Sequence, residues 1–152
     1  MIVLRELIII DGYNFIYSHP DYKGLKNFGL ELARAKLLED LADYRAFLGH
    51  DVLVVFDAAR VDFSRQKKDK ILGVDVVFTA KGETADSAIE KLVFKMTDRR
   101  ILTVVTSDYL EQKIVFGKGV LRKTPRELIQ EMKAARKQME EHFLDAVWKD
   151  NI

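Results

Sequence analysis

Four short apolar runs, rich in β-branched residues, recur along the chain, and each is followed by polar residues. They cover residues 7–10, 52–56, 74–78 and 101–105. Runs of this length with little polar alternation are typical of strands that are buried on both faces of a sheet. The pattern therefore predicts four strands in the interior of a mainly parallel sheet.

Two longer segments between these runs have a helical period instead. In residues 29–47 and 84–96, apolar residues recur every three or four positions with charged residues between them. That spacing places the apolar side chains on one face of a helix. Strands that alternate with helices imply right-handed crossovers and helices on both faces of the sheet. We therefore expect an α/β fold, a three-layer sandwich around a central sheet of four or five strands.

The last third of the chain contains two helix start signals. Asp108, with Glu111 three residues later, resembles a capping pair before a helix over residues 109–116. The sequence Thr-Pro-Arg-Glu at residues 124–127 combines a capping box with proline at the first helical position. This second signal predicts a long C-terminal helix over residues 124–148.

The segments between these elements are short. Residues 117–123 form either a glycine-flanked loop or a short fifth strand, and residues 60–70, the least periodic segment, are expected to form a mobile surface loop. With 152 residues, 48% of them hydrophobic, the chain is long enough to bury about 70% of its unfolded surface. The sequence contains no low-complexity linker and no internal repeat. We therefore expect a single domain over residues 1–152.

Charge and cysteine content limit the function classes. The 25 Lys and Arg nearly balance the 24 Asp and Glu, for a net charge of +1, so the placement of charge matters more than its total. The absence of cysteine excludes disulfides, thiolate nucleophiles and cysteine-bound metal clusters, and it suits a reducing compartment. The apolar start contains Arg5 and Glu6 and stops at Asp11, which is too short for a membrane span. We expect a cytoplasmic protein.

Aspartates follow the predicted strands. Asp11 and Asp57 end the first and second strands, Asp86 lies in the first turn of the helix after the third, and Asp108 follows the fourth by two residues. Ligands of open parallel sheets bind beyond the carboxyl ends of the strands, so we expect these four carboxylates to converge at one edge. A bound cation would relieve their mutual repulsion. Hard oxygen ligands select Mg²⁺ or Mn²⁺.

Each aspartate also has a structural interpretation. Aspartate is a common helix N-cap, and this role suits Asp86 and Asp108 as well as metal binding does. Asp11 and Asp57 end strands without directly opening an obvious helix, which favours metal binding for them. Asn14, three residues after Asp11, can offer its amide to a phosphate, a water molecule or the backbone.

Two other α/β classes also place an aspartate at a strand end. A phosphoacceptor receiver domain needs an adjacent pair of acids after the first strand, but Gly12 follows Asp11, and no Lys-Pro pair follows a late strand. A haloacid-dehalogenase-like phosphatase needs a second aspartate two residues after the first, where Tyr13 stands. Both classes are therefore disfavoured.

The ordered motifs resemble a known family. The sequence Asp-Gly-Tyr-Asn at residues 11–14, after a hydrophobic strand, is similar to the opening of NYN domains, which are PIN-like ribonucleases. Further blocks, in the expected order, resemble the YacP-like branch of that family at residues 54–58, 78–79, 83–86, 106–109 and 119–123. The resemblance spans about residues 7–130, nearly the whole chain.

This resemblance implies a metal-dependent endoribonuclease that uses one or two Mg²⁺ or Mn²⁺ ions. The acidic residues of the family match Asp11, Asp57, Asp86 and Asp108 here, with Asn14 beside them. Asp57 is the least secure direct ligand and could act through water. The implied reaction is the attack of an ion-activated water on an RNA phosphodiester, which requires no protein nucleophile.

Three neighbouring polar residues are assigned supporting roles. Thr106 and Ser107 match the hydroxyl-rich block before the last aspartate, and we expect them to hydrogen-bond a ligand or the scissile phosphate. Glu83 is either a ligand or a loop carboxylate, and we expect it to lie outside the direct ligands.

Basic residues flank the predicted site despite the neutral total. Residues 113–137 contain eight Lys and Arg against two acids, and residues 60–70 contain five against two. Such segments can hold RNA phosphates, and aromatic residues near Asn14 could stack on bases. The residues expected to contact RNA are Tyr13, Arg65, Lys67, Lys68, Lys118, Arg122 and Lys123, and Phe15, Tyr17 and Tyr22 are further candidates for stacking.

The expected partners are RNA and, through the resemblance alone, the ribosome, on which messenger RNA would be cleaved. No membrane contact is expected, and the sequence does not indicate an oligomeric state. One alternative stays open: a non-catalytic RNA- or ribosome-binding module whose aspartates cap helices or hold a structural ion. Metal-dependent cleavage of single-stranded RNA would separate the two.

Overall fold

The computed structural model describes residues 6–58, 67–96, 100–107 and 120–150. Within these ranges, six strands form one sheet in the order β3-β4-β2-β1-β5-β6. Neighbouring strands are parallel except for β3 and β4, which are antiparallel. The strands are β1 (Glu6–Asp11), β2 (Asp51–Phe56), β3 (Lys67–Ile71), β4 (Val74–Phe78), β5 (Ile101–Val105) and β6 (Leu121–Lys123). The prediction of an α/β fold with a mainly parallel sheet is confirmed.

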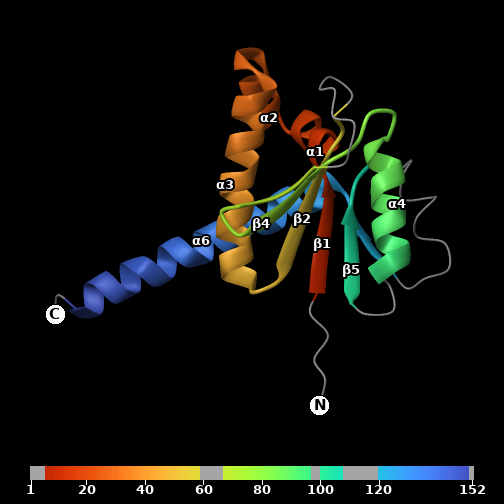
Figure 1. Cartoon of the computed structure of the whole chain (residues 1–152). Helices are drawn as coiled ribbons and strands as arrows, with labels where there is room; N and C mark the ends of the chain where they lie inside the picture. Colours follow the sequence, from red (N-terminus) through yellow and green to blue (C-terminus); the bar gives the residue numbers. More distant parts are fainter. Residues whose placement is uncertain (1–5, 59–66, 97–99, 108–119, 151–152) are drawn as a thin grey trace.

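Helices cover both faces of this sheet, which gives the three predicted layers (Figure 1). The helices are α1 (Gly12–Ser18), α2 (Pro20–Leu25), α3 (Leu30–Leu48), α4 (Ala85–Met96) and α6 (Pro125–Asp150), with a 3₁₀ turn, η1, at Lys26–Phe28. Helices α1, α3 and α6 pack on one face and α4 on the other. The helix predicted over residues 109–116 lies outside the described residues.

The alternation of side chains along each strand divides the core between the two faces. Ile8 and Ile10 of β1 pack with α1, α3 and α6, whereas Leu7 and Ile9 pack with α4. All four side chains are buried. This two-sided burial explains why the strand has a continuous apolar run and no polar alternation.

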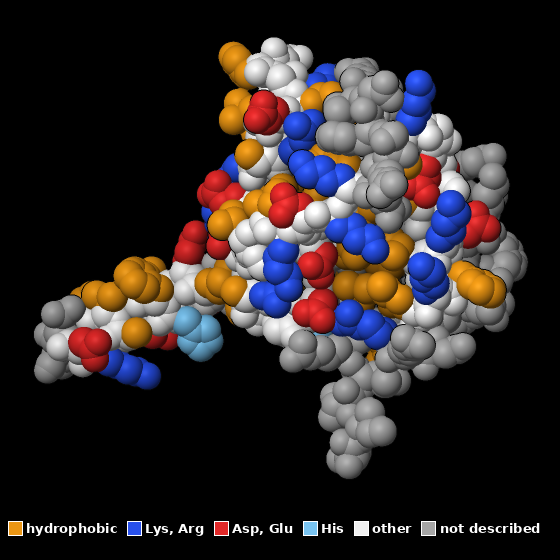
Figure 2. All heavy atoms as spheres, in the orientation of Figure 1, with side chains coloured by type: hydrophobic (Ala, Val, Ile, Leu, Met, Phe, Trp, Pro, Cys, Tyr) orange, Lys and Arg blue, Asp and Glu red, His pale blue; other side chains and the backbone are white. Residues whose placement is uncertain are grey.

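The long C-terminal helix begins where the capping sequence predicts. Thr124 Oγ1 accepts a hydrogen bond from the Glu127 backbone N–H at 3.2 Å, and Pro125 is the first helical residue. The N-terminal half of α6 packs on the sheet, and its C-terminal half projects away from the domain (Figure 1). Figure 2 shows apolar side chains along this projecting half, where Phe143 and Trp148 are exposed.

The fold differs from the sequence-based expectation at its edges. The sheet has six strands because Lys67–Ile71 forms β3, where a mobile loop was expected over residues 60–70. Residues 60–66 lie outside the described ranges. Two short helices, α1 and α2, occupy the segment after β1 that the apolar pattern left unassigned. In the described part of the chain, no helix combines the length and apolar composition that crossing a bilayer requires.

The order of the strands places a switch point at β1. From β1 the chain crosses to β2 on one side, and after β4 it returns through α4 to β5 on the other side. In open α/β sheets, ligands bind beyond the carboxyl ends of the strands at such a switch point. Asp11 stands at this position.

Candidate active site

Asp11 ends β1 and also opens α1. Its side-chain Oδ1 accepts a hydrogen bond from the Asn14 backbone N–H at 3.3 Å, which makes Asp11 the N-cap of that helix. The expectation that Asp11 does not open a helix was therefore wrong. An aspartate cap has two carboxylate oxygens, so one can hold the helix end while the other faces a ligand.

Thr79 fixes the backbone that carries Asp57. Asp57 directly follows β2, and the next backbone N–H, that of Ala58, donates to the buried Thr79 Oγ1 at 3.0 Å. The Thr79 backbone N–H in turn donates to the Phe56 carbonyl at 3.0 Å. Thr79 was not among the predicted site residues, although a threonine directly after an apolar strand can be recognised in the sequence.

Asp86 lies in the first turn of α4, but another residue caps that helix. Thr84 Oγ1 accepts from the Ser87 backbone N–H at 3.1 Å, so the capping position belongs to Thr84. This geometry removes the structural interpretation of Asp86 as an N-cap. Its carboxylate still gains from the helix N-terminus, which stabilises negative charge.

Asp57 and Asp86 both lie close enough to Asp11 for their charges to act on it. Burial raises the pKa of Asp11 from 3.8 to about 6; the hydrogen bond from the Asn14 backbone N–H opposes this rise, and the charges of Asp86 and Asp57 add to it. Asp57 and Asp86 therefore influence Asp11, and the convergence of the aspartates on one ion stays a prediction. Asp108, the fourth aspartate, lies outside the described residues.

Two buried side-chain oxygens near Asp11 have no hydrogen-bond partner in the described part of the chain. They are Asn14 Oδ1, in the first turn after Asp11, and Thr106 Oγ1. Thr106 directly follows β5, whose last residue pairs with Ile10, so Thr106 lies beside Asp11. Its backbone N–H donates to the Lys123 carbonyl at 3.2 Å, which fixes its position. A buried polar atom without a partner is costly unless a ligand satisfies it.

The fit of a divalent cation depends on this donor set. In the described ranges, no three His, Asp or Glu side chains are arranged as a metal site. Two features nevertheless suit a hard cation: the raised pKa of Asp11, which a positive charge would lower, and the unpartnered amide oxygen of Asn14. The residues therefore fit a cation in the chemistry of their oxygen donors.

Glu83 holds the loop before α4. Its Oε1 accepts from the Ala80 backbone N–H at 3.3 Å, and its Oε2 accepts from Lys91 Nζ at 3.2 Å. Both contacts are structural, and they agree with a position outside the direct ligands. Ser107 is exposed beyond the end of β5.

The aromatic residues after Asp11 divide into two groups. Tyr13 lies just beyond the carboxyl end of β1, and the centre of its ring is 5.1 Å from the centre of the Phe56 ring. Phe15 and Tyr22 are buried, and the Tyr22 hydroxyl donates to Asp40 Oδ2 at 2.6 Å, so these two rings cannot stack on RNA bases. Tyr17 is partly exposed, with Lys26 Nζ 4.6 Å from its ring centre.

A cavity of about 170 Å³ between α2, α3 and α6 is lined by Tyr22, Asp40 and Tyr44. Burial and the neighbouring carboxylates raise the pKa of both tyrosines, so they stay neutral donors. The cavity residues do not include the three aspartates, and we assign it no role in the site.

The two lysines of β3 that were expected to contact RNA lie on opposite faces of the sheet. Lys67 pairs with Phe78, which packs on the α3 side, and Lys68 pairs with Val77, which packs on the α4 side. Lys68 lines an open groove beside α4 together with Lys91. Arg65 lies outside the described residues.

The two basic residues on β6 are divided in the same way. Arg122 pairs with Val104 on the α4 side and is exposed. Lys123 is on the α6 side, where its Nζ donates to Glu131 Oε2 at 2.7 Å. Lys123 therefore has an intramolecular partner that the sequence analysis did not foresee. Lys118 lies outside the described residues.

Arg34 is a basic residue of this region that the sequence analysis missed. Its Nη1 donates to the Tyr13 hydroxyl at 2.9 Å, and its guanidinium carbon lies 5.9 Å from the centre of the Phe78 ring. Arg34 is one of several charged residues in α3 that the helical pattern assigns to the solvent-exposed side. Nothing in the sequence distinguishes it from the other charged residues of this helix.

Comparison with known proteins identifies relatives of the whole domain. The model of the YacP-like NYN domain family matches residues 8–150. The uncharacterized protein YacP of Bacillus subtilis (strain 168) is 40% identical over 136 residues, which cover 89% of this chain and 79% of that protein.

Two crystal structures of Rae1 (YacP) from Bacillus subtilis have the same fold. One superposes with a TM-score of 0.80 at 38% identity and covers 95% of this chain and 83% of that chain. The other, a W164L mutant, superposes with a TM-score of 0.78 at 37% identity and covers 93% of this chain and 82% of that chain.

Proposed function

Because the chain belongs to the YacP-like NYN domain family, we propose that it is a metal-dependent endoribonuclease that hydrolyses phosphodiester bonds in single-stranded RNA. Membership of a nuclease-like family supports a nuclease or RNA-related role in general. One observation supports the specific proposal: the partly buried Asp11 ends β1 at the switch point of the sheet, and burial, with the charges of Asp86 and Asp57, raises its pKa to about 6. Clustered carboxylates of this kind are typical of functional sites.

The residues proposed to hold a cation are Asp11, Asp57, Asp86 and Asp108, with the Asn14 amide oxygen beside them. Mg²⁺ and Mn²⁺ are the ions that prefer such oxygen donors, and we propose one or two of them. When bound, a divalent ion lowers the pKa of water and stabilises the negative charge that gathers on the phosphate oxygens.

The other residues of the site are proposed to position the RNA and the carboxylates. Thr79 holds the backbone at Asp57, and the Asp11–Asn14 hydrogen bond holds the start of α1. Thr106, with its hydroxyl lacking a partner in the described ranges, would donate to a phosphate oxygen. Arg122 lies on the exposed edge of the sheet, where it would attract the polyanion.

The proposed setting is the cytoplasm, with messenger RNA on the ribosome as substrate. The absence of cysteine suits a reducing compartment. The ribosome enters only through the resemblance to the YacP-like branch, so the two parts of the proposal are tested separately.

A cleavage assay tests the proposal. Purified protein is incubated with end-labelled single-stranded RNA in Mg²⁺, in Mn²⁺ and in chelator, and a parallel reaction contains a message under translation. We expect internal cleavage with either ion and none in chelator. Cleavage of the translated message alone would add the ribosome to the reaction. RNA binding without cleavage in every reaction would favour the non-catalytic module.

A further inference from the structure

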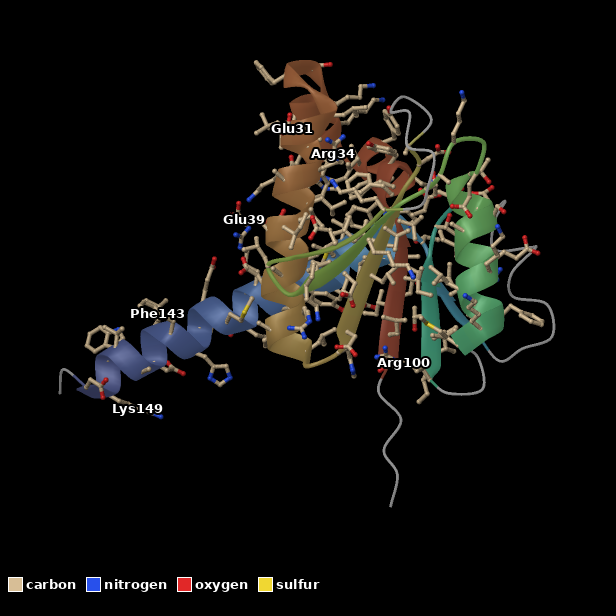
Figure 3. All side chains as sticks on the ribbon, in the orientation of Figure 1. Glu31, Arg34, Glu39, Arg100, Phe143 and Lys149 are labelled. Atoms are coloured by element: carbon tan, nitrogen blue, oxygen red, sulfur yellow. The ribbon has the colours of Figure 1, made fainter. Side chains whose placement is uncertain are left out.

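Arg34 connects α3 to the edge of the sheet at which Asp11 lies. Figure 3 shows Arg34 on the side of α3 that faces the sheet, whereas Glu39 on the same helix points away from it. Its hydrogen-bond partner, Tyr13, belongs to the first turn after Asp11, and Phe78 is the last residue of β4. The guanidinium therefore lies at the carboxyl ends of the strands.

The two aromatic residues that contact Arg34, Tyr13 and Phe78, are themselves held by packing. Tyr13 and Phe78 both pack on Phe56, with ring centres 5.1 Å and 5.6 Å apart respectively, and Phe56 is fully buried. A guanidinium that lies beside an aromatic ring and donates a hydrogen bond to a phenol hydroxyl has little freedom to move. This arrangement holds the planar donor group in one place, which lowers the entropy lost when it binds a ligand.

Among the partly buried arginines of the described residues, two are paired with a carboxylate, but Arg34 is not. Arg45 and Arg100 both pair with Asp51. No carboxylate in the described ranges lies within ion-pair distance of Arg34, whose hydrogen-bond partner is a neutral hydroxyl. Most of its five N–H donors are thus left for another acceptor. A partly buried positive charge without a carboxylate suits an anion that arrives with a ligand.

From these contacts we infer that Arg34, held by Tyr13, binds a phosphate group of the single-stranded RNA substrate on the α3 side of the aspartate site. This inference rests on the proposed function, because it takes RNA as the substrate. The phosphodiester backbone matches the forked donor geometry of arginine. A fixed positive charge here would also offset the repulsion between the aspartates and the incoming polyanion.

Direct binding measurements in chelator test this site without cleavage. Labelled single-stranded RNA is titrated with unmodified protein, Arg34→Met, Arg34→Lys and the control Lys36→Met across a salt series, and thermal melting checks that each variant is folded. Lys36 lies two residues further along α3 and pairs with Asp40, so its replacement removes the same charge from another side of the helix.

We expect Arg34→Met to weaken RNA binding about ten-fold and to reduce the magnitude of the logarithmic salt slope by about 0.7. Arg34→Lys should keep the slope and lose part of the affinity, because lysine keeps the charge and lacks the fork. Lys36→Met should change neither quantity.

Three results would each contradict either the phosphate site at Arg34 or the proposed function. Unchanged affinity and slope in Arg34→Met, in a protein that cleaves RNA with metal, would overturn the phosphate site and leave the proposed function standing. Equal losses of affinity and slope in Arg34→Lys and Arg34→Met would show a packing role and also overturn the site. Binding that depends on Arg34 in a protein that never cleaves would leave the site standing and overturn the proposed function.

Discussion

Replacing Asp11 with asparagine is expected to slow RNA cleavage roughly 100-fold and, without metal, to raise the free energy of unfolding at pH 7. Asparagine keeps the side-chain oxygen that caps α1, because it can accept the Asn14 N–H as aspartate does. It removes the negative charge that a cation needs. Loss of about 3 kcal/mol of transition-state stabilisation corresponds to roughly a 100-fold lower rate.

The gain in stability follows from the pKa of Asp11. The folded value of about 6 is above the ordinary 3.8, so the folded state binds the proton more tightly than the unfolded state does. The contribution of Asp11 to stability is therefore most favourable at low pH and falls as the pH rises from about 4 to 6. Above this range the ionised carboxylate costs as much as about 3 kcal/mol, and asparagine avoids this cost.

Thermal and chemical unfolding between pH 4 and pH 8 checks this prediction. Unmodified protein in chelator should lose stability over the titration of Asp11, and Asp11→Asn should not lose it there. The control is Asp11→Ala, which also removes the cap and should be about 1 kcal/mol less stable than Asp11→Asn. A purely structural Asp11 would give a different pattern: full activity in Asp11→Asn with its stability unchanged, and a loss of stability in Asp11→Ala alone.

Gly12→Ala is expected to destabilise the fold by about 1–3 kcal/mol. A Cβ atom at this position would lie 2.3 Å from Phe56 Cε1 and 2.9 Å from Val54 Cγ1. The Phe56 ring is fully buried between Tyr13 and Phe78 and cannot move aside easily. For a chain of this length, the melting temperature should fall by roughly 2–12 °C.

Gly24→Ala is the matched control for Gly12→Ala. Gly24 also lies in a short helix, and nothing within 4 Å would meet its Cβ. Alanine there should stabilise the protein by about 0.4–1 kcal/mol, because it restricts the unfolded chain. Equal effects of the two substitutions would show that Phe56 does not confine Gly12.

The central part of the fold could be predicted because its strands are buried on both faces. An apolar run such as residues 52–56 has few alternatives to an interior strand, and observed β2 differs from it by one residue. The edge strand β3 was missed because its sequence, Lys-Lys-Asp-Lys-Ile, is exposed and has no apolar face. Helices α1 and α2 have six or seven residues each, too few for a helical period to be recognised.

The positions of Asp11 and Asp57 could be predicted because the topology of the sheet determines where the strands end. Strand ends at a switch point bring Asp11 and Asp57 together whatever the side chains do. Contacts between side chains were not predictable, since the pairing of Lys123 with Glu131 and of Arg34 with Tyr13 depends on how α6 and α3 pack on the sheet. The same limit applied to Phe15, whose burial against α3 excludes a role in base stacking.

The cleavage rate of labelled single-stranded RNA, measured against Mn²⁺ concentration for the unmodified protein and Asp86→Asn, tests the central claim most directly. Thr84 caps α4, so Asp86→Asn should fold normally. We predict a rate that rises with Mn²⁺ to a plateau, is absent in chelator, and falls at least roughly 100-fold in Asp86→Asn. Cleavage that persists in chelator, or an Asp86→Asn variant as active as the unmodified protein at every Mn²⁺ concentration, would contradict the claim.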